Sequence, residues 1–141
     1  MKKIIILFAA ILTVIVFPLF SNAEETLGQL ATFNIEKTYD SEKRDGLQAT
    51  LRKISPQLYF YIDDAWWNGL SVEERANVQE AMNSLTEEFE GRIYPILTQT
   101  FGKEWSPGID QDTRITILFH PMKEGAGGYF NEGNEYPKSQ V

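Results

Sequence analysis

Residues 47–62, LQATLRKISPQLYFYI, contain two strand patterns separated by a turn. In residues 47–52, apolar and polar side chains alternate, which is typical of a strand with one buried face. Ser55-Pro56 interrupts this pattern, and Leu58–Ile62 then follows with bulky side chains on both faces. A strand without a polar face needs cover on both sides. We therefore expect a hairpin whose second strand lies centrally in its sheet.

The clearest helix signal comes after this hairpin. Residues 71–74, SVEE, form a capping box, in which the Ser71 hydroxyl accepts from the Glu74 amide and the Glu74 side chain reaches back. The apolar residues that follow at helical spacing are Val78, Met82, Leu85 and Phe89. They predict one buried stripe along the helix. Pro95 suits the first turn of a second, short helix that ends before Gly102.

Two further strand patterns complete the expected fold, at residues 31–35 and 114–119, whereas residues 24–29 are polar and predict a frayed leader. The order predicts an α+β fold, with a small, mostly antiparallel sheet packed against one main helix and a short second helix.

Residues 120–141 are rich in glycine and poor in aliphatic side chains, so we expect them to be poorly packed. A long unstructured segment is uncommon in a complete domain, so we expect the incomplete front half of a larger one.

The N-terminus has the three parts of a secretory signal peptide. Two lysines precede an apolar run at residues 4–20, and small residues follow at 21–23. A retained membrane anchor is the alternative, because this run approaches the length that spans a bilayer. The proline and the small residues near its end favour cleavage. We expect a signal peptide at 1–23, a single α+β segment at 24–141, and a secreted or extracytoplasmic protein that meets membranes only through the uncleaved signal.

Charge and composition exclude several classes of function. The net charge is −7, or −9 without Lys2 and Lys3, and such a surface repels phosphate backbones. We therefore expect no nucleic-acid partner. There is no cysteine, so packing or bound ions must stabilise the fold instead of disulfides. Nine Phe, six Tyr and three Trp are too many aromatic residues for a disordered segment.

The sequence offers little catalytic chemistry. His120 is the only histidine, and there is no HExxH motif, so a zinc site with several His ligands is not possible. A Ser-His-Asp triad would have to use His120, and no serine near it lies in a recognisable motif. A lone His is more often structural. Asp63-Asp64 before Trp66-Trp67 raises the alternative of a sugar site, but adjacent carboxylates point apart and the tryptophans suit corner packing. We assign no catalytic and no metal-binding residue.

Two other segments could bind a ligand or have only a structural role. Asp110, Asp112 and residues 131–134 carry the oxygen ligands that calcium prefers, without the EF-hand pattern. Turn residues that bond their own backbone are the simpler interpretation, so calcium remains an open alternative. Residues 125–130, GAGGYF, are the most unusual stretch, because glycines let the backbone approach a ligand closely.

Four segments resemble, in their order along the chain, a known family. They are Ile62–Trp67, Phe101–Asp110, Arg114–Leu118 and Gly127–Phe130. Together they resemble the N-terminal part of the catalytic domain of secreted bacterial zinc metallopeptidases of the hyicolysin type, relatives of immune inhibitor A and of thermolysin-like enzymes. The similarity covers roughly residues 31–138.

The resemblance implies a zinc peptidase, but the sequence contains only part of what such an enzyme needs. In such enzymes a later helix bears HExxH, whose two His bind zinc and whose Glu activates water. The chain lacks these ligands, so we expect no hydrolysis and no cofactor here, with zinc and a polypeptide substrate implied only for a full-length domain. The resemblance places Gly127, Gly128, Tyr129 and Phe130 along the substrate cleft. The alternative is a complete small secreted binding module whose aromatic surface meets glycans or cell-envelope partners.

We predict that residues 24–141 hold no intrinsic zinc. A zinc site needs three or four protein ligands, and one His without Cys does not supply them. After dialysis of the purified, tag-free chain against metal-free buffer, elemental analysis should find far less than one zinc per chain. Stoichiometric zinc that survives dialysis would contradict the prediction.

Overall fold

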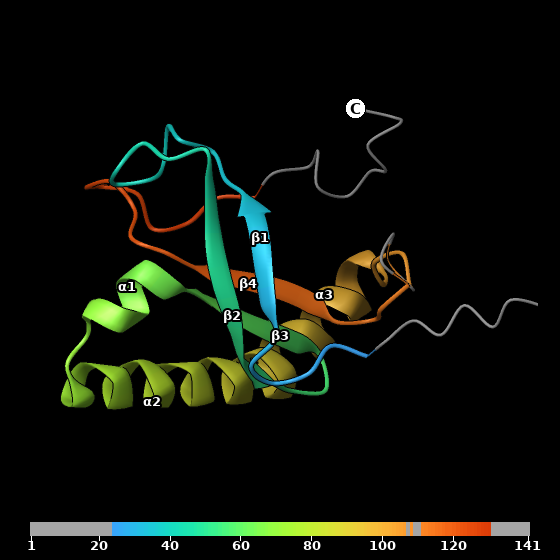
Figure 1. Ribbon diagram of the computed structural model, residues 1–141. Helices are drawn as coiled ribbons and strands as arrows, with labels where there is room; N and C mark the ends of the chain where they lie inside the picture. The colour runs from blue at the N-terminus through green and yellow to red at the C-terminus, as the bar shows by residue number, and fades with distance from the viewer. Residues whose placement is uncertain (1–23, 107, 109–110, 131–141) are drawn as a thin grey trace, which may run out of the picture.

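A computed structural model describes residues 24–106, 108 and 111–130. Its four strands are β1 (Leu30–Asn34), β2 (Gly46–Ile54), β3 (Leu58–Asp63) and β4 (Ile115–Phe119). They form one curled sheet in the order β1-β2-β3-β4 (Figure 1). The first three strands pair antiparallel, and β4 pairs parallel with β3. The predicted α+β fold with a mostly antiparallel sheet is thus confirmed.

Strand β3 is buried at all six positions. Leu58, Phe60 and Ile62 pack toward the main helix, whereas Tyr59 and Tyr61 belong to a second hydrophobic cluster on the opposite face. The neighbouring strands β2 and β4 take up the main-chain hydrogen bonds of β3 on its two sides. The predicted central strand is therefore confirmed, and it divides the molecule into two faces.

The helices follow β3 and cover one face of the sheet (Figure 1). They are α1 (Asp64–Gly69), α2 (Val72–Glu88), the π-helical turn η1 (Phe89–Ile93) and α3 (Tyr94–Phe101). The capping box begins α2 as predicted, with the Ser71 amide 2.8 Å from the Glu74 carboxylate and the Glu74 amide 3.2 Å from the Ser71 hydroxyl.

The predicted apolar stripe of α2 contacts the sheet. Met82 is fully buried, and Val78, Leu85 and Phe89 are partly buried in the same cluster as Phe60. The helix does not stop at Gly91 but passes through η1 into α3, where Pro95 lies in the first turn. A proline cannot donate the main-chain hydrogen bond of a regular helix, and the wider π turn lies where that bond is missing.

Helix α1 is an element that the sequence did not predict. It is only six residues long, and Asp63 at the end of β3 caps it by accepting from the Ala65 amide at 3.0 Å. A short helix with such a local cap has too little periodicity to be recognised from sequence. Within the described residues, no helix is long and apolar enough to span a membrane.

Two segments are packed better than predicted. The Gly28 amide donates to Leu51 at 2.8 Å, so the polar leader is paired with β2 and not frayed. The Ser41 amide donates to Pro121 at 3.1 Å and the Lys123 amide to Tyr39 at 2.9 Å. The expectation of poor packing is therefore wrong for residues 120–123, whereas most of 124–130 is exposed. Residues 131–141 and the expected signal peptide at 1–23 lie outside the described residues.

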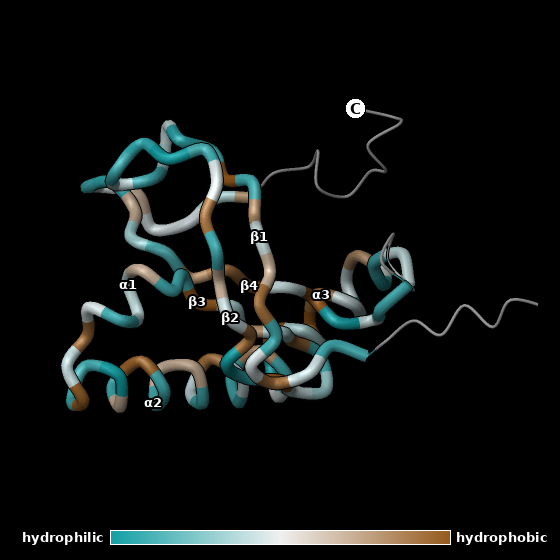
Figure 2. The backbone as a smooth tube through the Cα atoms, in the orientation of Figure 1, coloured by the Kyte–Doolittle hydropathy of each residue, from teal (hydrophilic) through white to brown (hydrophobic). Residues whose placement is uncertain are grey.

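The loop that pairs with this segment joins β1 to β2. It lies beside the chain that follows β4 (Figure 1), and it is hydrophilic along most of its length, whereas the strands below it mix hydrophobic and hydrophilic residues (Figure 2). Main-chain hydrogen bonds and the contact of His120 with Asp40 hold these two segments together, along with the stacking of Tyr129 on Tyr39.

We predict that Met82→Ala lowers the free energy of unfolding by about 2–5 kcal/mol, because the truncation leaves a cavity between α2 and β3. Val72→Ala on the same helix is the control, since Val72 is 84 % exposed and should change stability by no more than about 0.5 kcal/mol. Urea unfolding followed by circular dichroism measures both. Equal midpoints for the two variants would contradict this placement of α2.

Candidate functional site

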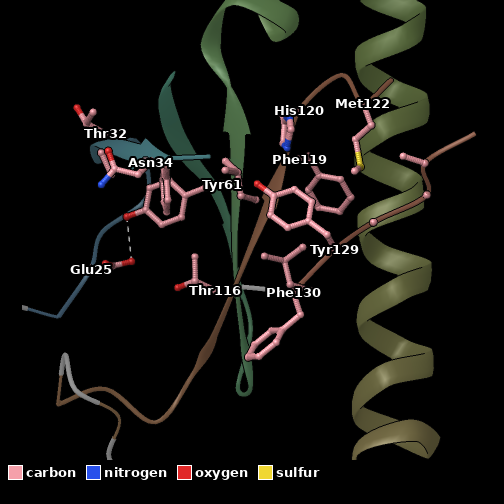
Figure 3. Close-up of a pocket in the computed structure, with 17 residues that line it drawn as sticks. Glu25, Thr32, Asn34, Tyr61, Thr116, Phe119, His120, Met122, Tyr129 and Phe130 are labelled. Carbon is pink, nitrogen blue, oxygen red and sulfur yellow. Dashed lines mark hydrogen bonds between the residues drawn. The ribbon is translucent and has the colours of Figure 1, made fainter. Parts of the chain in front are cut away.

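An open groove of about 980 Å³ lies between β1 and β4, the two edge strands of the sheet. Residues 31–34 of β1 line one side and residues 116–119 of β4 the other, and Tyr61 of β3 also contributes. Figure 3 shows these side chains together with Glu25 from the N-terminal segment and the aromatic residues that follow β4. Among the described residues, no strand pairs with the outer edge of β1 or β4.

The four cleft candidates named from the resemblance all line this groove: Gly127, Gly128, Tyr129 and Phe130. The Tyr129 ring stacks on Tyr39 with 5.1 Å between centroids, and its hydroxyl accepts from the Glu36 amide at 3.1 Å. Tyr129 is thus held by the β1–β2 loop. Phe130 is 76 % exposed, so its ring is free to contact a bound molecule.

Glu25 and Tyr61 meet within the groove (Figure 3). The Tyr61 hydroxyl donates to a Glu25 carboxylate oxygen at 2.9 Å. Burial, and after it the hydrogen bond to Glu25, raises the pKa of Tyr61 well above its ordinary value, so Tyr61 remains a neutral donor. Phe33 packs edge-on against Tyr61 at 5.0 Å. Glu25 was not predicted as a site residue because no local pattern distinguishes it from the other polar residues before β1.

A buried charge cluster lies next to the groove and consists of Asp40, Arg44, Asp63 and His120. The Arg44 guanidinium donates to Asp40 and to Asp63, each at 2.8 Å. Nδ1 of His120 lies 3.1 Å from the same oxygen of Asp40, and it carries the hydrogen because a carboxylate only accepts. Both carboxylates are almost completely buried, at 1 % and 2 % exposure.

The charge cluster joins three separate segments of the chain. Asp40 and Arg44 lie in the β1–β2 loop, Asp63 ends β3, and His120 follows β4. The hydrogen bonds from Arg44 hold the pKa of Asp40 far below its ordinary value despite burial. Asp40 is thus charged and paired with Arg44, which also bonds Asp63, and the loop is fixed beside the chain that leads from His120 to Tyr129.

This cluster does not fit zinc. It offers one imidazole and two carboxylates, and the Arg44 cation already occupies the position between those carboxylates. Over the part of the chain that the structure describes, no group of three or more His, Cys, Asp or Glu side chains is placed to hold a metal ion.

The calcium alternative falls mostly on residues that the structure does not describe. Asp110 and residues 131–134 lie outside the described residues. The Asp112 carboxylate accepts from the Tyr59 hydroxyl at 2.7 Å and from the Arg114 amide at 2.9 Å. The bond from the Arg114 amide fits the turn interpretation, and calcium binding stays the open alternative.

The adjacent carboxylates considered for a sugar site diverge. Asp63 belongs to the charge cluster, whereas Asp64 accepts from the Thr50 hydroxyl at 2.7 Å and from Arg52 at 3.0 Å. Trp66 and Trp67 are partly buried against the hydrophobic cluster between α2 and β3. These residues do not form a pair of carboxylates facing each other across a ligand, which glycoside hydrolysis requires.

No protein-family model matches the chain, and no curated protein is similar enough to count as a match. An assignment of function therefore depends on the groove and on the residues that carry the resemblance.

We predict that Asp40→Asn destabilises the protein by about 3–5 kcal/mol at neutral pH, because it removes one carboxylate from a buried ion pair. The lowered pKa of Asp40 stabilises the fold above the unfolded-state pKa, about 4, and this contribution is lost as the pH falls toward the folded-state value. Urea unfolding between pH 7 and acid should therefore show a steeper loss of stability in the original protein than in Asp40→Asn. Parallel pH profiles would contradict the assignment.

Proposed function

We propose that the chain is the front portion of an exported zinc-metallopeptidase-like domain, and that its groove holds an extended polypeptide without hydrolysing it. The observation that carries this proposal is the position of Gly127–Phe130. These residues, which the resemblance assigns to a substrate cleft, line a groove with both edges of the sheet. Export rests on the sequence of residues 1–23 alone.

The geometry of the groove suits an extended chain. Strands β1 and β4 present main-chain N–H and C=O groups at their outer edges, and an extended peptide can pair with such an edge. Alternate side chains of that peptide would then point into the groove, because successive side chains of a strand point to opposite faces. Phe130 supplies an exposed apolar surface, and two glycines beside it let a backbone come close.

The chain's own residues supply binding and no hydrolysis. A peptidase of this class needs an activated water, and the described residues offer neither the zinc ligands nor a carboxylate held beside them. A reading frame that continues beyond Val141 into a helix with HExxH would support the proposal. A stop codon there would favour a separate binding module or a decayed gene.

A glycan-binding module is the second candidate, and one observation favours it. Phe101, the last residue of α3, and Trp105, which follows the helix, are 82 % and 93 % exposed, and exposed aromatic rings are suited to stacking against sugars. This surface does not overlap the residues that line the groove. The two candidates therefore predict ligands at different places on the molecule.

We predict that a short, acetylated and amidated peptide of alternating Val and Thr binds in the groove and remains intact. Amide chemical shifts of Thr116, Gly127 and Gly128 should move on titration, and mass spectrometry should find the peptide uncleaved. A soluble chitin oligosaccharide in place of the peptide should leave these shifts and the Trp105 indole unchanged. Shifts confined to Trp105 with the sugar would favour the glycan module, and cleavage of the peptide would contradict a non-catalytic chain.

We also predict that Phe130→Ala weakens binding of this peptide roughly tenfold or more, since burial of a large apolar side chain contributes about 1.5–3 kcal/mol. Phe101→Ala is the matched control, because it removes a similarly exposed ring outside the groove. Isothermal titration calorimetry compares the two. Equal losses of affinity in both variants would mean that the peptide does not occupy the groove.

A further inference from the structure

We propose that the groove selects a polypeptide segment with a Lys or Arg side chain, and that Glu25 is the counter-ion of that cation. This inference rests on the proposed polypeptide function and specifies its ligand. Among the described residues that line the groove, Glu25 is the only acidic side chain, and none is Lys or Arg. The groove therefore carries one negative charge without a positive neighbour in its own wall.

The hydrogen bond that Glu25 makes does not neutralise it. Its one side-chain partner in the described part of the chain is the Tyr61 hydroxyl, and the pKa of Tyr61 is raised, so the partner is neutral. That bond fixes the direction of the carboxylate and uses one of its two oxygens. The second oxygen remains an acceptor for a charged donor, and hydrogen bonds between a cation and a carboxylate are about twice as strong as neutral ones.

The aromatic side chains of the groove add a second attraction for a cation. Figure 3 shows Glu25 and Tyr61 on one side and Tyr129 and Phe130 on the other, with Thr116 between them. The faces of such rings attract ammonium and guanidinium groups. The same protein already uses this contact, because the Lys123 ammonium lies 4.9 Å from the centroid of Tyr39, the ring on which Tyr129 stacks.

An anionic or a purely apolar segment fits less well. Among the described lining residues, only His120 could pair with an anionic ligand, and its Nδ1 is already bonded to Asp40. The net charge, −7 for the full sequence and −9 without Lys2 and Lys3, attracts cationic ligands over a longer range and repels anionic ones. An apolar side chain opposite Glu25 would remove water from the carboxylate without replacing its hydrogen bonds, which is unfavourable.

The test compares two Val/Thr peptides, with a central Lys or a central norleucine, on the chain recovered after export. Calorimetry at low salt should find the Lys peptide roughly fivefold to tenfold tighter, with the difference shrinking as salt is added. Glu25→Gln keeps the acceptor for Tyr61 but removes the charge, so it should abolish the preference. Glu24→Gln is the control, because Glu24 pairs with Arg114 and does not line the groove.

The outcomes separate this inference from the proposed function. Equal binding of both peptides would overturn the cationic preference and leave the polypeptide groove intact. Binding of neither peptide would overturn both. A free diamine, cadaverine, that binds as tightly as the Lys peptide would overturn a polypeptide ligand in favour of a small amine. A preference lost equally in Glu24→Gln would mean that net charge, not Glu25, causes it.

Discussion

The guanidinium group of Arg44, placed between two buried carboxylates, is the interaction on which the arrangement around the groove depends. It pairs with Asp40 of its own loop and with Asp63 at the end of the central strand, and Asp40 in turn holds His120 after β4. Breaking a buried pair leaves an uncompensated charge, which makes each partner costly to remove. The cluster thus fixes the β1–β2 loop against the chain that leads from β4 to Tyr129, and with it one wall of the groove.

The other constraint is the burial of β3 on both faces. Leu58, Phe60 and Ile62 pack under α2 in one hydrophobic cluster, which covers the first face. Its two tyrosines lie on the opposite face and need partners for their hydroxyl groups, which Glu25 and Asp112 supply. The second face is thus amphipathic and open between the sheet edges, and this is the face that offers a binding site. Aliphatic or Phe side chains alternate with tyrosines along β3, so one face of the sheet is covered by helices and the other forms the groove.

Local patterns predicted most of the elements but not how they meet. The hairpin, the capping box at Ser71 and the stripe through Met82 depend on neighbours within a few turns of chain, and the structure confirms them. The charge cluster was missed because Arg44 and Asp63 are 19 residues apart and Asp40 and His120 are 80 apart. The pairing of residues 24–29 with β2 was missed for the same reason. The groove residues at 127–130 came from the resemblance, since no periodicity marks them.

Amide hydrogen exchange tests most directly the claim that the charge cluster positions the groove wall. The amides of Glu36, Ser41 and Lys123 donate across the contact between the two segments, to Tyr129, Pro121 and Tyr39. In the original protein they should exchange slowly, as in β4. In Arg44→Met they should exchange much faster, while the amides of β3 keep their protection. Unchanged protection of the three amides in Arg44→Met would contradict the account, because the wall would then stand without the ion pairs assigned to hold it.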